Sequence, residues 1–237
     1  GHRIPIWYKE DEIYCGLSKP DGDGWIQDQD VLDTWFSSWL WPFATLGWPD
    51  DTDDLKKFYP TNDLVTGPDI IFFWVARMIM AGKYFCKEIP FSNVYFTGII
   101  RDTKGRKMSK SLGNSPDPLD LFEKYGADAV RVSILMIAPQ GLDILFSEER
   151  LEQGRNFMNK LWNSSRFILM NLEDSLPTAL REINMENLDA TDRWILSRLS
   201  RTMEKVDRAY SDYKMNEAIR YVYDFIWADF CDWYIEF

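Results

Sequence analysis

The stretch that decides the fold is residues 63–100, DLVTGPDIIFFWVARMIMAGKYFCKEIPFSNVYFTGII. Asp63–Thr66 is typical of a strand, and Gly67-Pro68 predicts the start of a helix, because proline suits the first helical turn. A helical run of about 15 residues follows. Asn93–Ile100, rich in β-branched and aromatic residues, predicts a second strand. Strand, helix and strand in this order predict a parallel sheet with a crossover helix.

On the N-terminal side of this unit the pattern is less regular. Residues 1–25 are polar and contain the turn-forming run Lys19–Gly24, so we expect mainly loops there. Val31–Trp41 mixes aromatic and small residues and predicts a short helix. Asp50–Lys57 is highly charged, and we expect a surface loop.

On the C-terminal side the chain becomes helical. Asp117-Pro118 predicts a helix start and Gly126 its end. Ser147 is expected to cap a second helix, with glutamates in its first turn, where the helix dipole favours them.

Two further helical runs, 191–210 and 214–237, follow a loop over about residues 175–190. Nothing after Ser147 is typical of a strand. The predicted fold class is α/β followed by all-α, with the change near residue 140.

Charge and cysteines narrow the class of protein. The net charge is −11, and residues 1–66 contribute −8 of it (13 acids, 5 bases), which argues against a sequence-blind nucleic-acid binder. Residues 101–110 are the exception, with five bases and one acid.

Three dispersed cysteines and the single His2 argue against a structural zinc site, and free thiols fit a reducing cytosol. The most apolar run, Ile70–Ala81, is too short to span a bilayer, so no membrane segment is expected.

The strongest chemical signal is Lys107–Ser111, KMSKS, followed by Leu112-Gly113-Asn114. Two lysines three residues apart on a loop, with hydroxyls between them, can hold the phosphates of a nucleotide and stabilise charge on a departing phosphate group. Most clusters of lysine and serine are simply solvated loops. Here the position of the cluster after a predicted strand favours the phosphate-binding interpretation.

Several stretches together resemble the class I aminoacyl-tRNA synthetases. KMSKS is a signature of that family, and Thr97–Arg106 resembles the strand that leads into it. Gly1–Pro5 resembles the segment that follows the family's inserted editing domain, and Asn159–Asn163 the start of its anticodon-binding domain. Asp33–Phe43, DTWFSSWLWPF, resembles the valine-specific members rather than the isoleucine-specific ones.

The resemblance implies a domain organisation and an activity. Residues 1–140 would be the second half of a Rossmann-like catalytic domain, and residues 141–237 a truncated helical anticodon-binding domain. The implied reaction joins valine to ATP, with Mg²⁺ accompanying the nucleotide, releases pyrophosphate and transfers the valyl group to tRNA(Val) in the cytoplasm.

The resemblance also implies site residues. Lys107 and Lys110 would be catalytic. Asp69, whose carboxylate can accept hydrogen bonds from ribose hydroxyls, would bind the ribose beside Gly67; alternatively it only complements the helix dipole. The ATP-binding residues would be Gly67, Asp69, Gly98, Ile100, Lys107, Met108, Ser109, Lys110 and Ser111.

Three residues would line the amino-acid pocket by the same resemblance: Trp35, Ile70 and Trp74. Flat aromatic faces and one branched aliphatic side chain suit an isopropyl group. The chain contains 11 tryptophans, however, and most must be ordinary core residues. Arg166 would contact a tRNA phosphate or base, or else is a solvated helix residue.

Two features of the family do not occur in this sequence. Its other signature, HIGH, is missing, and there is no room for the editing domain, so we expect the chain to be inactive by itself. Two alternatives stay open: a synthetase for isoleucine or leucine, against which Asp33–Phe43 argues, and a non-catalytic tRNA-binding module, against which the intact KMSKS and Asp69 argue.

Overall fold

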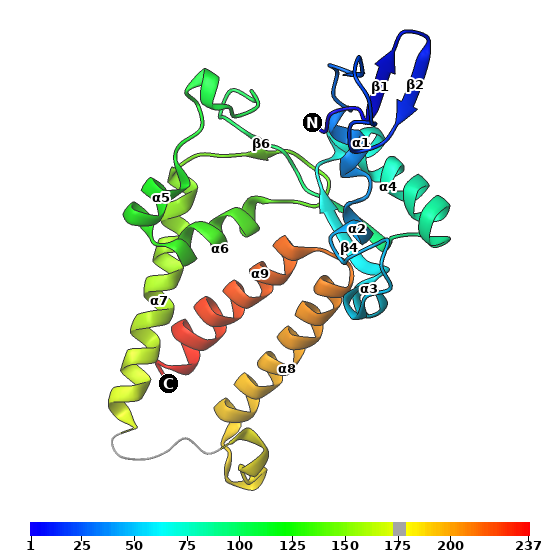
Figure 1. Ribbon diagram of the computed structural model, residues 1–237. Helices are drawn as coiled ribbons and strands as arrows, with labels where there is room; N and C mark the ends of the chain where they lie inside the picture. The colour runs from blue at the N-terminus through cyan, green and yellow to red at the C-terminus, as the bar shows by residue number, and fades with distance from the viewer. Residues whose placement is uncertain (173–178) are drawn as a thin grey trace. The chain divides into compact units, whose positions relative to one another are not determined.

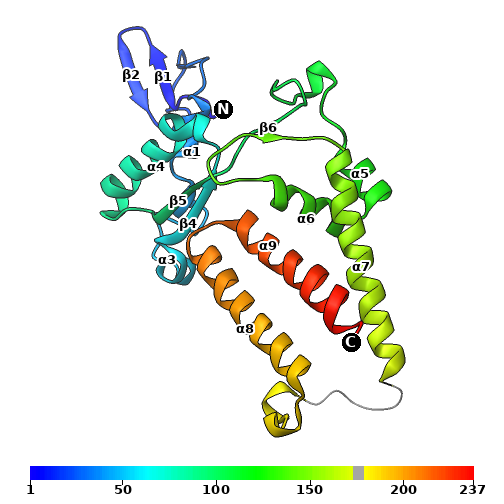
Figure 2. The same cartoon turned by 180° about the vertical axis from the view of Figure 1, so that it is seen from behind.

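The computed structural model describes residues 1–172 and 179–237 and divides into two compact units, Gly1–Phe96 and Thr97–Phe237 (Figures 1 and 2). The second unit carries the end of the α/β pattern together with the helical part. The predicted organisation into residues 1–140 and 141–237 therefore stays a prediction. The fold class, α/β followed by all-α, is confirmed.

The first unit begins with a sheet where loops were predicted. β1 (Ile6–Lys9) pairs antiparallel with β2 (Glu12–Cys15) and β3 (Ile26–Gln27), in the order β2-β1-β3. The hairpin has little buried surface, since every residue of β2 is exposed. A strand that buries neither face lacks the alternation of apolar and polar residues by which a sequence reveals it, and this is why the prediction was wrong.

Three short helices follow. α1 (Thr34–Ser38) and α2 (Trp41–Ala44) confirm the helix predicted for this part of the chain. α3 (Asp53–Phe58) corrects the predicted charged loop. Its charges suit a helix, because acids lie in the first turn, bases in the last, and the Thr52 hydroxyl accepts from the backbone N–H of Leu55 at 3.1 Å.

The strand–helix–strand unit is confirmed, with irregular helical geometry. β4 (Thr61–Thr66) and β5 (Phe91–Phe96) pair in parallel, Thr61 beside Phe91 and Thr66 beside Phe96. The connection contains a 3-10 turn, a π-helix, α4 and a second π-helix: Pro68–Ile70, Ile71–Val75, Ala76–Ala81 and Gly82–Cys86. Its Val75 and Met78 form a buried cluster with Phe91 of β5.

The second predicted strand, Asn93–Ile100, is two strands in the structure. β5 ends at Phe96, and β6 (Ile100–Arg101) pairs in parallel with β7 (Ile144–Leu145). Gly98 lies between them, where a Cβ would be 2.0 Å from the Leu142 carbonyl oxygen. Only glycine permits this approach, which redirects the chain from one strand partner to the next.

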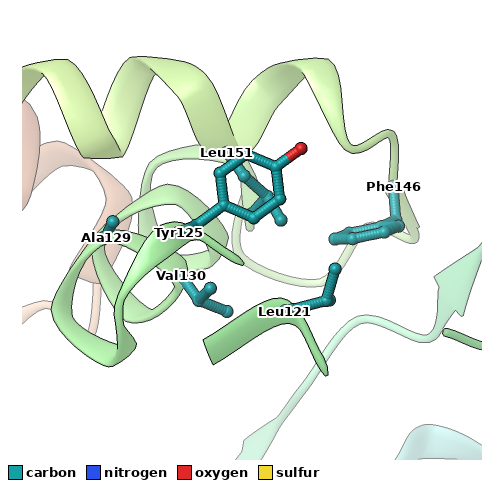
Figure 3. Close-up of a cluster of buried hydrophobic side chains, with 6 residues drawn as sticks. All are labelled: Leu121, Tyr125, Ala129, Val130, Phe146 and Leu151. Carbon is teal, nitrogen blue, oxygen red and sulfur yellow. The ribbon is translucent and has the colours of Figure 1, made fainter. Parts of the chain in front are cut away.

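The α-helices of the second unit start with α5 (Pro118–Tyr125) and α6 (Ala127–Ile137). The Asp117 carboxylate caps α5 at the backbone N–H of Leu119, and Gly126, with φ of 89°, separates the two helices, as predicted. α7 (Glu149–Asn171) starts after Glu148, and no side chain caps it, so the cap predicted at Ser147 is wrong. The core of this region consists of Leu121, Tyr125, Ala129, Val130, Phe146 and Leu151 (Figure 3).

The C-terminal helices are also as predicted. α8 (Ala190–Ser211) begins at a reciprocal capping box between Asp189 and Asp192. α9 (Met215–Asp224) continues as a π-helix, Phe225–Tyr234, and packs on α8 and α6 (Figures 1 and 2). The predicted loop over residues 175–190 lies partly outside the described residues; from residue 179 it contains two 3-10 turns, Leu180–Glu182 and Met185–Asn187.

The crossing of α6 and α7 depends on Gly154. A Cβ at this position would lie 2.4 Å from the carbonyl oxygen of Ala129 and 2.2 Å from the Ser133 hydroxyl oxygen. The backbone of Ala129 cannot move aside as a flexible side chain can. The absence of a side chain at Gly154 therefore lets the two helices pack at this distance.

We predict that Gly154→Ala destabilises the protein by about 1–3 kcal/mol, because the added methyl group overpacks the crossing. At an exposed helical position the same change would stabilise by up to about 1 kcal/mol. Denaturant unfolding of both proteins measures the difference. Ser165→Ala, on an exposed part of α7, is the control and should change little. A more stable Gly154→Ala would contradict the packing described here.

Candidate active site

The lysine loop (Lys107–Ser111) projects from the second unit between β6 and α5. Lys107 and Lys110 are exposed, whereas Met108 is half-buried and packs against the core cluster around Leu121. Ser109 is the N-cap of a 3-10 turn, Lys110–Leu112, and its hydroxyl oxygen accepts from the backbone N–H of Leu112 at 3.3 Å. The loop is thus anchored by its apolar residue and presents its charged residues outward.

A buried carboxylate stands at the base of the loop. Asp102 is only 8% exposed, and its carboxylate accepts the backbone N–H groups of Lys104 (3.0 Å) and Arg106 (2.9 Å). It also accepts the Arg106 Nε–H (2.8 Å) and the Asn114 amide (2.9 Å). A buried charge is costly unless it is fully hydrogen-bonded, and these four bonds satisfy that requirement.

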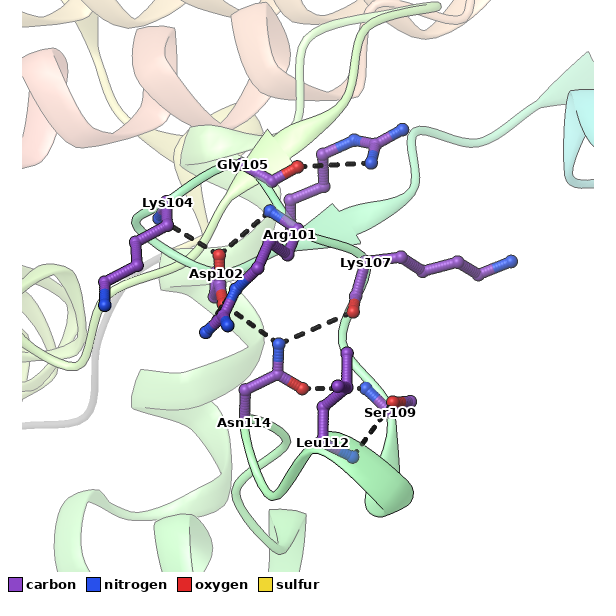
Figure 4. Close-up of polar contacts among 9 residues, drawn as sticks. Arg101, Asp102, Lys104, Gly105, Lys107, Ser109, Leu112 and Asn114 are labelled. Atoms are coloured by element: carbon purple, nitrogen blue, oxygen red, sulfur yellow. Dashed lines mark hydrogen bonds and ion pairs between the residues drawn. The ribbon is translucent and has the colours of Figure 1, made fainter.

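Asn114 joins this carboxylate to the lysine loop (Figure 4). Its Nδ2 donates to Asp102 at 2.9 Å and to the Lys107 carbonyl at 3.4 Å, while its Oδ1 accepts from the backbone N–H of Ser109 at 2.9 Å. One amide group therefore holds both ends of the segment 107–109. We call Asp102 and Asn114 the clamp.

Two carboxyl groups near the loop have lowered pKa values. The hydrogen bonds from the Asn114 amide and the Arg106 backbone N–H hold the pKa of Asp102 well below its usual range. Asp143 pairs with Arg101 and accepts from the backbone N–H of Ile99, and the Arg101 hydrogen bond lowers the pKa of that carboxyl. The bonds of Asp143 hold the chain at Ile99 and Arg101, just before Asp102.

An apolar cavity of about 370 Å³ lies beneath the loop. It is lined from β6 and the loop by Ile100, Lys107 and Met108, and from the helices by Leu121, Phe122, Val130 and Ile134. The predicted adenine contacts, Gly98 and the backbone of Ile100, belong to this same unit. Gly98 brings the backbone close to Leu142, so its place in the fold has a steric reason besides the predicted nucleotide contact.

The first unit holds the other predicted ATP-binding residues. Gly67 and Asp69 lie at the carboxyl end of β4, where the 3-10 turn begins, which is the usual ligand position in an open α/β sheet. Asp69 is exposed, and a Cβ at Gly67 would lie 2.7 Å from its Oδ1. Glycine therefore leaves space for this carboxylate.

The three predicted pocket residues belong to three elements of the first unit: α1, the 3-10 turn and the π-helix. Trp35, on α1, contacts the ring of Phe73 with centroids 5.9 Å apart. Trp74 donates from Nε1 to the Ser38 carbonyl at 3.0 Å, which ties the π-helix to α1. Ile70 ends the 3-10 turn, four residues before Trp74. π-helical turns are often found at functional sites, and this one carries Trp74.

Arg166 lies exposed on α7. It borders a shallow apolar groove whose other lining residues are Trp162, Ser165, Leu169 and Met170.

In the described residues no group of three or more His, Cys, Asp or Glu side chains could hold a metal ion. The three cysteines are free thiols. No described helix is both long and apolar enough to cross a membrane.

The clamp was not predicted from the sequence. Asp102 is the only acid among the five bases of residues 101–110, and Asn114 follows Gly113, whose φ is 63°. A single acid among these bases was a signal that its carboxylate accepts hydrogen bonds from donors of the same segment. Its partner, 12 residues away, depends on the path of the chain and had no signal of its own.

Comparison with known proteins defines the class. The family model of class I tRNA synthetases (I, L, M and V) matches residues 9–147, and that of the anticodon-binding domain of tRNA ligase matches residues 192–237. The chain belongs to the class I tRNA synthetases. Over its whole length it is 52% identical to the valine–tRNA ligase of Thermotoga maritima and 51% identical to that of Chlorobaculum tepidum. It spans 28% of the length of each.

Solved structures show the same fold. A LeuRS of Agrobacterium radiobacter K84, in a ternary complex with tRNA and LeuAMS, matches 96% of this chain and 34% of its own, with a TM-score of 0.80 and 20% identity. Methionyl-tRNA synthetase of Mycobacterium tuberculosis, in complex with methionyl-adenylate, matches 93% of this chain and 42% of its own, with a TM-score of 0.66 and 24% identity.

The lowered pKa of Asp102 predicts a pH dependence of stability. A carboxyl group whose pKa is lower in the folded state stabilises that state above its unfolded value, about 3.9, and loses this contribution as pH falls through the folded value. Asp102→Asn should therefore have a lower free energy of unfolding than wild type at pH 6. The difference between the two proteins should become smaller below about pH 4. Urea unfolding at several pH values measures it; a gap that does not change with pH would contradict the role of the charge.

Proposed function

We propose that this chain is part of a valine–tRNA ligase. The enzyme activates valine with ATP, releases pyrophosphate and transfers the valyl group from the adenylate to tRNA(Val). The observation that carries the proposal is an intact KMSKS loop, held by the clamp, in a chain about half identical over its whole length to valine–tRNA ligases. Because the chain spans 28% of those relatives, the activity is that of the larger protein.

Lys107 and Lys110 stabilise the charge of the departing pyrophosphate. Both are exposed on a loop whose backbone is fixed, so their ammonium groups can follow charge as it moves from the breaking bond to the leaving group. Met108, Ser109 and Ser111 complete the phosphate-binding segment. Mg²⁺ arrives with ATP on its phosphate oxygens and needs no dedicated protein site here.

The remaining nucleotide contacts come from glycines and backbone. Asp69 accepts the ribose hydroxyls beside Gly67, while Gly98 and the backbone of Ile100 contact the adenine. Trp35, Ile70 and Trp74 hold the valine side chain. The hydrogen bond from Trp74 to α1 supports this assignment, because it fixes the orientation of one pocket wall.

The helical part binds tRNA. Residues 141–237 form part of the anticodon-binding domain and residues 1–140 part of the catalytic domain. The match of residues 192–237 to the anticodon-binding family model supports this division. Arg166, exposed beside an apolar groove, contacts tRNA(Val). The free thiols and the acidic net charge suit a protein of the cytoplasm.

The first test concerns Lys110. In the full-length protein, Lys110→Ala should slow valyl-adenylate formation about 10²-fold or more, as expected for removal of one transition-state donor, and leave valine binding nearly unchanged. Pre-steady-state adenylation measures the rate. Lys104→Ala, which also removes an exposed lysine of this region, is the matched control and should stay close to wild type. Unchanged adenylation by Lys110→Ala would refute the role.

The second test concerns amino-acid selectivity. If Ile70 limits the pocket, Ile70→Ala should raise the kcat/KM of isoleucine relative to valine, by the equivalent of about 1–3 kcal/mol for one methylene. Valine itself should bind less well, having lost packing. Amino-acid-dependent ATP–pyrophosphate exchange gives the ratio. Ile79→Ala, which removes an aliphatic group packed against the core, should destabilise without changing the ratio. If both variants behave alike, Ile70 is a core residue.

A further inference from the structure

The conformation of the lysine loop is determined by side chains outside the KMSKS sequence. Asp102 precedes the loop and Asn114 follows it, and their side chains meet at 2.9 Å (Figure 4). Asp102 holds the chain that enters the loop, through the N–H groups of Lys104 and Arg106. Asn114 holds the loop itself, through the Lys107 carbonyl and the Ser109 N–H.

These contacts lead directly to the two lysines. The Asn114 amide fixes the backbone at Lys107, whose side chain extends away from the clamp in Figure 4. The same amide fixes Ser109, and the Ser109 hydroxyl caps the 3-10 turn that begins with Lys110. The clamp therefore contacts the backbone of Lys107 directly, and it contacts Lys110 indirectly, through the turn that Ser109 caps.

From this geometry we infer that Asp102 and Asn114 are positioning residues for Lys107 and Lys110. They set the shape of the loop backbone, so the two ammonium groups keep their positions relative to each other when charge develops on the leaving group. Asp102 does so although it is an anion near a site for anions. The Arg106 guanidinium (2.7 Å) neutralises its charge, and three neutral donors complete its hydrogen bonds, which leaves the lysines to act on the phosphates.

The inference rests on the proposed function. It predicts a loss of activity for a substitution that, by charge alone, should improve phosphate binding. Asp102→Asn makes the loop more positive, and by charge alone it should bind phosphates more tightly. If Asp102 positions the lysines, the same change lowers kcat for adenylation by about 10²-fold in the full-length protein, with KM for valine unchanged. Asn114→Ala, which keeps the net charge, should lower kcat to a similar extent.

The exchange of the pair gives a rescue. In the double variant Asp102→Asn with Asn114→Asp, an amide again faces a carboxylate, the net charge equals that of wild type, and the oxygen at position 114 still accepts the Ser109 N–H. A carboxylate at position 114 cannot donate to the Lys107 carbonyl, and the amide at position 102 no longer pairs with the charge of Arg106, so the rescue is partial. This variant should recover about tenfold of the kcat lost in Asp102→Asn, because residues in one network are not additive. Asp117→Ala removes the cap of α5 in the same unit and controls for stability: it should unfold more easily yet keep the wild-type kcat.

A second measurement separates this inference from the proposed function. If wild type shows no valine-dependent ATP–pyrophosphate exchange, the proposed function fails, and titration with inorganic pyrophosphate alone still tests the clamp. Asp102→Asn should then bind pyrophosphate several-fold more weakly than wild type, and the exchanged pair should bind it more tightly than Asp102→Asn does. Equal or tighter binding by Asp102→Asn, or full adenylation activity in that variant, would overturn the inference.

Discussion

The hydrogen bonds of the Asp102 carboxylate are the constraint on which the lysine loop depends. A buried anion is stable only with donors on its oxygens, and here the donors come from both arms of the loop: backbone N–H groups before it and the Asn114 amide after it. Satisfying the charge therefore forces the loop into one shape. The low pKa of Asp102 has the same origin, because those donors favour the ionised form.

A second constraint acts from the apolar side. Met108 packs against the core of α5, α6 and the segment before α7, while its neighbours Lys107 and Ser109 are held by Asn114. The KMSKS sequence thus divides its roles between an apolar anchor, a hydroxyl that caps a turn, and two lysines left exposed. Two glycines permit close backbone approaches elsewhere in the same unit, Gly98 beside Leu142 and Gly154 beside Ala129.

Much of the fold could be predicted because its signals are local. Gly67-Pro68 between two predicted strands predicts a parallel unit, and Asp117-Pro118 with Gly126 predicts α5, since caps and turns depend on neighbouring residues. The hairpin of β1 and β2 could not be predicted, because every residue of β2 is exposed and no residue of β1 is fully buried. α3 could have been found from Thr52 and the ordered charges that follow it. The break at Gly98 and the π-helices depend on tertiary packing, which one sequence does not display.

The site could be predicted as far as KMSKS by resemblance. The clamp could not, because it forms only when residues 12 positions apart meet.

The most direct test of this account is amide hydrogen exchange at Ser109 in the protein without nucleotide. The clamp requires that the Ser109 N–H donate to Asn114 Oδ1 before any phosphate is bound, so this amide should exchange about tenfold or more slowly than the rate expected for unstructured chain. The amides of Lys104 and Arg106, bonded to Asp102, should be protected with it. Exchange of Ser109 at the unstructured rate, with Lys104 and Arg106 equally unprotected, would show that the loop has no fixed conformation and would contradict the account.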